Sequence, residues 1–523
     1  MSPTGRLLAA FTVLHAAVGA WIATSVAGPM LAIDDIAFLS MGRTLAGDGA
    51  AAIGAQPPYG ILYPLLLAPG WFVGLDESQM VVYAQVGNAI LGALLIPVLY
   101  ALVRRLTRAA RSTAITGALV GASLPAALLT GSIVWTERLL PLLVALGLLG
   151  VTLLHERVTG GRVALVVVVA IALFATHPRT GAAAVVLIVA AVGFAFRAGQ
   201  IPASVTAAAL GISGLRLAEV ARAWVADAAF DSTGTYDAGD LVSRRGIDDI
   251  PHMAIHAGGT VAYLVLATAG LAILGALVIT AKPQVAKVVA GIGVGIVVVA
   301  GWFLTGVDRS DAWLHGRYIE ILAPPLVALG IVGAKQLPWR ISATVIAAGG
   351  VVAGFYGAWA GPGNNWQTPR SPVMMLGTEV SGAPFGGNFF EPGAAASAGI
   401  VVGLLLLAAL QWRNRAALAV AGTAITLAVF SGLAALDDLQ QNSVVGQVQA
   451  SPVADADIDL LVIDVDRVPR NLAAAVAYEV GLDRAQADAD PTATHLLLEA
   501  DTAPPPGATL LAEFEFGSVW TLG

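Results

Sequence analysis

The sequence contains no cysteine among its 523 residues. Disulfides are therefore excluded, and so are metal centres and clusters that need thiolate ligands. Charged residues are also scarce: they make up 12% of the chain, against about 25% in soluble globular proteins. No P-loop occurs, and no GxGxxG is followed by an acidic residue. An ATP-driven pump and a nicotinamide-dependent enzyme therefore have no support in the sequence.

Hydrophobic residues, by contrast, make up 57% of the chain. Uncharged runs of about 18 residues or more recur along it, and each is long enough to cross a bilayer. The sequence therefore predicts a polytopic α-helical membrane protein. We expect thirteen transmembrane helices, near residues 7–28, 80–103, 113–131, 138–154, 163–178, 180–197, 203–224, 255–280, 286–305, 318–334, 341–360, 396–412 and 416–436.

Two apolar segments need a separate interpretation. The run at 59–75, YGILYPLLLAPGWFVGL, is interrupted by Pro64, Pro69 and Gly70, so we expect an interfacial or re-entrant segment rather than a full span. The first run follows Arg6 and is longer than the apolar region of most signal peptides. We therefore expect an uncleaved first helix.

The distribution of charge predicts the orientation. With the N-terminus inside, the inner loops hold all three lysines, many of the arginines and a single acid, Glu156. Every other Asp and Glu then falls outside or at an outer helix end, as the positive-inside rule requires. An odd number of spans places the C-terminus outside. We expect a multi-pass protein of the cell (plasma) membrane, with a cytoplasmic N-terminus and an extracytoplasmic C-terminal domain.

The tail at 437–523 differs from the preceding transmembrane part, 1–436. It holds 15 acidic residues and three arginines. Strand-like runs such as IDLLVIDVD, THLLLEAD and TLLAEFEF alternate with one helical run, LAAAVAYEVGL, and turn signals such as Pro504–Gly507 separate them. The pattern predicts a small extracytoplasmic α/β domain.

The first outer loop, 29–79, holds the densest group of side chains that could take part in a reaction. It begins with IDDIAFLSMGRTLAGDG, in which Asp34 and Asp35 are adjacent just beyond the first predicted helix. Adjacent carboxylates close to a bilayer are costly unless they are solvated, paired or used in a reaction. Such a carboxylate can act as a general base.

Further motifs follow in order along the outer face. A Pro- and Tyr-rich stretch follows the carboxylates, WTER (135–138) opens the fourth predicted span, THPR (176–179) closes the fifth, and HGRYI (315–319) opens the tenth. In this order and sidedness, the chain resembles the GT-C superfamily of membrane glycosyltransferases. The likeness is greatest to the polyprenyl-phosphate-sugar-dependent branch, the protein mannosyltransferase and aminoarabinose-transferase group. Thirteen spans and an outer α/β domain also match that branch.

The resemblance implies an inverting glycosyltransferase that moves a sugar from a polyprenyl-phosphate donor to a glycan, lipid or protein acceptor at the outer face. It implies that Asp34 is the base and Asp35 its neighbour. The donor phosphate needs cations, for which the outer face offers Arg317, His315, Arg179 and Arg43. Glu137, Tyr59 and Tyr318 are further candidates. We expect Arg317, with Arg179 or His315, to lie together with Asp34.

The chain departs from that branch at one point. The branch often places a lysine before the Pro/Tyr stretch, where this sequence has Gln56. Phosphate binding would then depend on arginine and histidine. No cofactor is indicated, a divalent metal stays open but without a supporting motif, and no feature suggests nucleic acid; membrane lipids are the expected surroundings.

Other interpretations remain open at this stage. Asp34 and Asp35 could only cap a helix, Arg179 could snorkel, and Arg244 and Arg245 could contact lipid headgroups. The acids of ADADID (454–459) lack the glycine turn and bidentate glutamate of a calcium loop. A lipid or solute transporter or flippase, or an inactive scaffold of the same fold, are the alternative functions. The scarcity of intramembrane charge, with Arg216 and Glu219 the main exception, counts against a coupled transporter.

Overall fold

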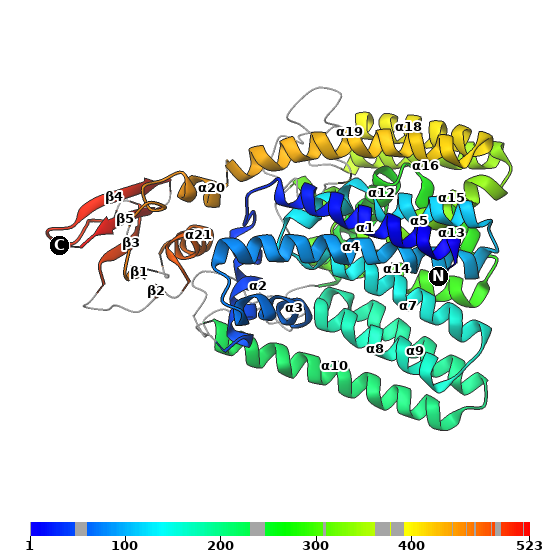
Figure 1. Cartoon of the computed structure of the whole chain (residues 1–523), viewed down its shortest axis with the longest axis horizontal. Helices are drawn as coiled ribbons and strands as arrows, with labels where there is room; N and C mark the ends of the chain where they lie inside the picture. The colour runs from blue at the N-terminus through cyan, green and yellow to red at the C-terminus, as the bar shows by residue number, and fades with distance from the viewer. Residues whose placement is uncertain are drawn as a thin grey trace.

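The computed structural model consists of a long helical bundle with a small sheet-containing unit at one end (Figure 1). It describes the chain apart from residues 1, 48–59, 231–245, 307–309, 361–376, 378–391, 442, 457, 465–466, 483, 487–492, 501, 516 and 523. The fold is therefore a polytopic helical one with a C-terminal sheet, as the sequence predicts.

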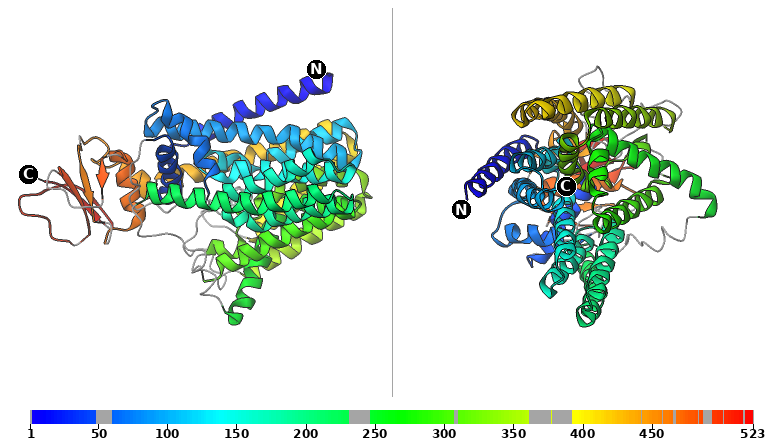
Figure 2. Two further views of the ribbon diagram at one scale, coloured as in Figure 1. Left: turned by 90° about the horizontal axis from the view of Figure 1, so that it is seen from below. Right: turned by 90° about the vertical axis from the view of Figure 1, so that its right-hand side faces the viewer.

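The bundle is built from long apolar helices and several shorter ones. The long helices are α1 (Pro3–Thr24), α4 (Glu77–Thr107), α7 (Leu139–Glu156), α9 (Gly181–Arg197), α10 (Ile201–Ala229), α12 (Ile250–Ala267), α14 (Pro283–Leu304), α16 (Trp339–Ala360), α18 (Pro392–Trp412) and α19 (Asn414–Gln441). The shorter ones are α5 (Arg111–Ala122), α6 (Pro125–Leu129), α8 (Gly160–Thr176), α13 (Leu271–Ile279) and α15 (Ala323–Gln336). Both views of Figure 2 place α1 at the edge of the bundle.

The expected number of spans is only partly reproduced. Ten helices of the described chain are long and apolar enough to cross a membrane, or eleven if the bent pair α5 and α6 counts as one span. Each of the thirteen expected segments coincides with a helix or a broken helix pair, but α8 and α15, at 17 and 14 residues, are shorter than a usual span. The number thirteen therefore stays a prediction.

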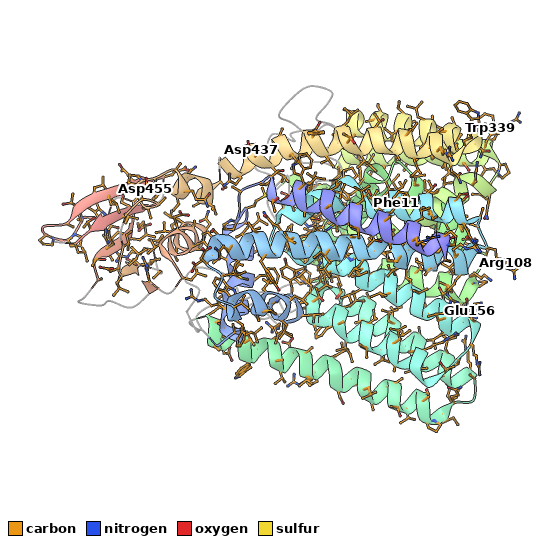
Figure 3. The ribbon with its side chains drawn as sticks, viewed as in Figure 1. Phe11, Arg108, Glu156, Trp339, Asp437 and Asp455 are labelled. Carbon is orange, nitrogen blue, oxygen red and sulfur yellow. The ribbon has the colours of Figure 1, made fainter. Side chains whose placement is uncertain are left out.

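Residues expected on opposite sides of the membrane lie at opposite ends of the bundle. Arg108, Glu156 and Trp339 lie at the end away from the sheet, whereas Asp437 and Asp455 lie toward the sheet (Figure 3). The N- and C-termini lie at opposite ends of the molecule (Figure 1), which agrees with an odd number of crossings. For brevity we call the end that carries the sheet the sheet end.

Two short helices of the first outer loop lie at the sheet end of the bundle. The helix α2 (Ala32–Leu45) has Asp34 and Asp35 in its first turn and Arg43 in its last, an arrangement that complements the helix dipole. Helix α3 (Leu62–Phe72) has 11 residues and is therefore about 16 Å long, far short of a bilayer. The segment 59–75 thus does not cross the membrane as a helix.

The C-terminal unit is a five-stranded mixed sheet with the strand order β2-β1-β3-β5-β4. Strands β1 (Leu461–Ile463), β2 (Ala485–Gln486) and β3 (His495–Glu499) pair in parallel, and β5 (Gly517–Thr521) joins β3 to β4 (Thr509–Phe514) with antiparallel pairing. Two helices, α20 (Val444–Gln449) and α21 (Arg470–Val480), complete it. Helix α19 continues to Gln441, five residues past the predicted end of the transmembrane part at 436.

The C-terminal unit packs on the segment at 29–79, which the sequence predicts to be the first outer loop. Helix α21 contacts α2, and one continuous apolar cluster contains Met30 and Phe38 from the loop together with Leu472 and Val476 from α21. This contact places the C-terminal unit directly over the two adjacent carboxylates of the sequence.

Candidate functional site

A buried ionic cluster lies at the sheet end of the bundle, where α2 meets the bundle helices. Its first member is Asp34, in the first turn of α2. Oδ2 of Asp34 accepts hydrogen bonds from Nε1 of Trp135 and from Nη1 of Arg317, both at 3.2 Å. The Asp34 side chain is 15% exposed, so it can still be reached from solvent.

Glu137 is the second acid of the cluster and joins two arginines. Its Oε1 accepts hydrogen bonds from Nε of Arg317 at 2.8 Å and from Nη2 of Arg179 at 2.6 Å. Its other oxygen, Oε2, accepts a hydrogen bond from the Thr136 hydroxyl at 3.0 Å. Only 3% of the Glu137 side chain is exposed. One buried carboxylate therefore fixes two guanidinium groups from distant parts of the chain.

Aromatic rings also pack against the guanidinium groups of these two arginines. The Cζ atom of Arg317 lies 3.6 Å from the ring centroid of Trp135, and that of Arg179 lies 5.3 Å from the ring of Tyr318. The backbone N–H of Arg179 donates to Nδ1 of His177 at 3.1 Å. The WTER, THPR and HGRYI motifs, separate in sequence, therefore meet in one site.

The ion pairs of the cluster join opposite charges. In the described part of the chain, the carboxylates of Asp34 and Glu137 face the guanidiniums of Arg179 and Arg317. Buried charges need such compensation, because removing them from water costs several kcal/mol per ion. An anion that entered the cluster would compete with these carboxylates for the arginines.

Two polar residues of α4 hold the irregular segment that carries Trp135 and Glu137. The side chain of Gln85 donates to the carbonyl of Ser132 at 3.0 Å, and that of Asn88 donates to the carbonyl of Ile133 at 2.9 Å. Both side chains are buried within an otherwise apolar helix. They satisfy carbonyls that the break between α6 and α7 leaves without helical partners.

Asp35 does not join the cluster. Its Oδ2 accepts hydrogen bonds from the backbone N–H groups of Met30 and Leu31 at 2.9 and 3.3 Å, and its side chain is fully buried. Burial raises the pKa of Asp35 to about 8, and the neighbouring Asp34 charge adds to the rise. The capping alternative therefore describes Asp35, whose carboxyl reaches back to the residues that precede the helix, but it does not describe Asp34.

The remaining sequence candidates take separate positions. Arg43, in the last turn of α2, contacts Glu77 at 3.2 Å and the ring of Trp71 at 5.3 Å. It is nine residues from Asp34 along one helix, or about 13 Å. Nδ1 of His315 lies 3.7 Å from Oδ2 of Asp311, and its ring packs on Tyr318. Tyr59, Arg244 and Arg245 lie outside the described residues.

A hydrogen-bonded pair of a glutamate and a tyrosine, not expected from the sequence, borders a small and mostly apolar cavity. Glu320 accepts a hydrogen bond from the hydroxyl of Tyr263. Both residues line the cavity together with Glu137, Thr130 and Thr268. The signal that could have found Gln85, Asn88 and Glu320 is a polar or acidic side chain within or next to an apolar span, the same signal that Arg216 and Glu219 give.

No group suited to a metal ion is apparent in the described part of the chain, where no three His, Asp or Glu side chains come together to hold one. Nδ1 of His256 lies 2.9 Å from the carbonyl oxygen of Ala312, to which it can donate a hydrogen bond, and the His256 ring packs at a tilt on the ring of Trp313. Asp457 of the ADADID run lies outside the described residues.

These features define a GT-C-like fold: a helical membrane bundle, a short carboxylate-bearing helix after the first span, and a C-terminal sheet over it. The solved structure of ArnT from Cupriavidus metallidurans bound to undecaprenyl phosphate matches over 99% of this chain and 98% of its own, with a TM-score of 0.56 and 16% identity. ArnT from the same organism in the apo state matches over 98% of both chains, with a TM-score of 0.55 and 17% identity.

A third match is weaker. The arabinosyltransferase EmbB from Mycobacterium smegmatis aligns over 97% of this chain and 45% of its own, with a TM-score of 0.47 and 14% identity. No protein-family model matches the sequence, and no curated protein sequence matches it either. The ArnT matches confirm the fold that the sequence motifs predicted.

Proposed function

We propose that the protein is an inverting glycosyltransferase that moves a sugar from a polyprenyl-phosphate donor to a hydroxyl of a glycan, lipid or protein acceptor at the outer face of the membrane. One observation carries the proposal: Asp34, which solvent can reach, accepts a hydrogen bond from Arg317, whose other side is bound to the buried Glu137. The ArnT-like fold supports it, because one ArnT structure holds undecaprenyl phosphate.

In the proposed reaction, the acceptor hydroxyl gives its proton to Asp34 while its oxygen bonds to the anomeric carbon of the sugar. The bond from that carbon to the phosphate oxygen breaks, and its electron pair leaves with the polyprenyl phosphate. Arg317 and Arg179 stabilise the charge that develops on the phosphate. The acceptor attacks from the face opposite the phosphate, so the anomeric configuration inverts.

The resting cluster suggests how the base is released. In the structure Nη1 of Arg317 is bound to Oδ2 of Asp34, so the arginine occupies an oxygen that an acceptor hydroxyl could otherwise use. A donor phosphate competes for that guanidinium, whereas the buried Glu137 keeps its hold on Nε. Donor binding would then free Asp34 to accept the proton.

The other candidates take supporting roles in this proposal. The ring of Tyr318 packs against Arg179, the ring of His315 packs against Tyr318, and Tyr59 stays a candidate site residue. Arg43 joins α2 to the start of α4 through Glu77, and its part in donor-phosphate binding stays a prediction.

The decisive experiment compares wild type with Asp34→Asn in transfer from a panel of radiolabelled polyprenyl-phosphate sugars by purified protein. Asparagine keeps the volume but cannot take up the proton, so turnover should fall by about 10²–10⁴. Thermal stability serves as the control. An active Asp34→Asn enzyme would remove Asp34 from the base role.

The same preparation separates the alternative functions. A wild-type protein that binds polyprenyl phosphate in proteoliposomes and moves it between leaflets, without forming product from any donor, would be a flippase. A wild-type protein that binds none of the donors would be a scaffold. Either result contradicts the glycosyltransferase proposal.

A further inference from the structure

Trp135 touches both partners of the ion pair in the cluster. It is fully buried, and its indole N–H donates to Oδ2 of Asp34 at 3.2 Å. The face of the same ring lies 3.6 Å from Cζ of Arg317. Glu137, two residues further along the chain, is a site candidate from the sequence motifs, whereas Trp135 is not.

Three contacts fix the plane of the Arg317 guanidinium. Its Nε is bound to Glu137, its Nη1 to Asp34, and its face to Trp135. A desolvated guanidinium over an indole ring is attracted by the negative face of the ring. If the contact with Asp34 is given up to a phosphate, the contacts with Glu137 and Trp135 still orient the cation.

The orientation of the Asp34 carboxylate also depends on the indole of Trp135. Its Oδ2 accepts both the Trp135 N–H and the Arg317 N–H. When Arg317 turns to a phosphate, the indole N–H stays as the donor that fixes the carboxylate rotamer. One carboxylate oxygen can hold that hydrogen bond, and the other is then available for the acceptor proton.

Trp135 is suited to this task because its own position is fixed. It follows Ser132 and Ile133, whose carbonyls accept hydrogen bonds from Gln85 and Asn88 of α4. Asp34 and Arg317 come from segments 283 residues apart. The indole is therefore a rigid reference between two groups that the chain brings together from far away.

We propose that Trp135 is a positioning residue that keeps Asp34 and Arg317 in their productive orientations after the donor phosphate has broken the ion pair between them. The proposal rests on the glycosyltransferase function proposed above. It predicts different consequences for the loss of the N–H and for the loss of the ring.

Two substitutions separate these contributions. Trp135→Phe keeps a ring face but removes the N–H, so kcat should fall about tenfold to a hundredfold, as for a hydrogen bond to a charged group, with the donor KM unchanged within about twofold. Trp135→Leu also removes the face beneath Arg317, so donor KM should rise by about tenfold as well. Trp135→His, which keeps a planar ring with an N–H, should lose less kcat than Trp135→Phe.

Trp302→Phe is the matched control. In the described part of the structure the indole nitrogen of Trp302 is buried without a hydrogen-bond partner, and the residue lies in α14, outside the cluster. The same substitution there should change neither kcat nor KM. If Trp135→Phe behaves like Trp302→Phe, or if all three Trp135 variants lose activity only in proportion to their loss of thermal stability, the positioning role is wrong.

A second readout does not depend on transfer. Undecaprenyl phosphate raises the Tm of a protein that binds it, and titration of this rise gives its affinity for wild type and for the variants. Trp135→Leu removes the ring beneath Arg317, so its affinity should fall about tenfold, whereas Trp135→Phe and Trp302→Phe should stay within about twofold of wild type. An unchanged affinity of Trp135→Leu overturns the proposal, whereas weaker binding with an inactive wild type overturns only the function on which it rests.

Discussion

At the scale of single residues, the two adjacent carboxylates have opposite environments. Asp34 faces the arginines and solvent, whereas Asp35 turns inward to the backbone of Met30 and Leu31. Sequence analysis could identify the pair, because two acids beside a membrane are unusual. It could not assign their roles, since one residue along a helix turns a side chain by about 100° and only the packing decides which one faces the site.

Asp35→Asn should reveal this difference through the pH dependence of stability. The folded state raises the pKa of Asp35 to about 8, above the value of about 4 in an unfolded chain. The folded state therefore binds more protons between these values, and the wild type loses stability as pH rises from about 4 to 8. Asparagine cannot ionise, so the variant should gain Tm relative to wild type over that range.

The measurement is a thermal unfolding series in detergent from pH 5 to 8.5. Turnover of Asp35→Asn should stay within about tenfold of wild type, in contrast to Asp34→Asn. A Tm difference that does not change with pH would contradict the buried, proton-binding role of Asp35.

Glu137→Gln tests the buried partner of both arginines. The substitution leaves Arg179 and Arg317 without their shared charge, and breaking a buried ion pair on one side typically costs about 3–5 kcal/mol. We therefore expect a marked fall in Tm. Because a phosphate would replace the lost negative charge, polyprenyl phosphate should raise the Tm of the variant more than that of wild type. An equal shift in both proteins would mean that the phosphate does not bind at these arginines.

At the scale of elements, the site depends on breaks in helices rather than on the helices themselves. Hydropathy predicts the spans because lipid-facing and core-facing residues are alike apolar. The segment that carries Trp135 and Glu137 instead consists of the short turns Thr130–Ser132 and Thr136–Arg138. Their shape comes from tertiary hydrogen bonds such as those of Asn88, which no local pattern in the sequence specifies.

Asn88→Leu is the test at this scale. It removes the donor to the Ile133 carbonyl and should cost about 1–3 kcal/mol, because a buried carbonyl loses its partner. The displaced turn should also lower turnover, since misplacement of a reacting group by about 1 Å can cost a hundredfold. Gln284→Leu, which loses only an exposed contact with Arg197 at the other end of the bundle, is the control. Equal activity in the two variants would show that Asn88 does not position the site.

The number of membrane spans is also only partly predictable from the sequence, because some spans are broken. Sequence analysis found each apolar segment, but α12 and α13 form one expected span that is broken at Gly270, which has a left-handed backbone. Likewise, α5 and α6 bend by 55°. Breaks of this kind are stabilised by neighbouring helices, so they cannot be located from hydropathy alone.

At the scale of the whole molecule, the C-terminal unit and the ionic cluster share one end of the bundle. Buried residues of α21 and of the first outer loop form one apolar cluster, so whatever side of the membrane holds the sheet also holds Asp34. The orientation of the chain therefore decides which side of the membrane the proposed reaction uses. Charge distribution predicts the outer side, because the basic loops gather at the opposite end.

The absence of native cysteine makes this orientation directly measurable. A cysteine introduced at Ala508, next to β4, should react with a membrane-impermeant maleimide in intact cells. A cysteine at the exposed Ala110, between the arginine-rich end of α4 and α5, should react only after permeabilisation. The opposite pattern would place Asp34 in the cytoplasm, where transfer would face soluble acceptors, and would invert the topology together with the site. Labelling of both positions in intact cells would mean an even number of crossings between them, which disagrees with their places at opposite ends of the bundle.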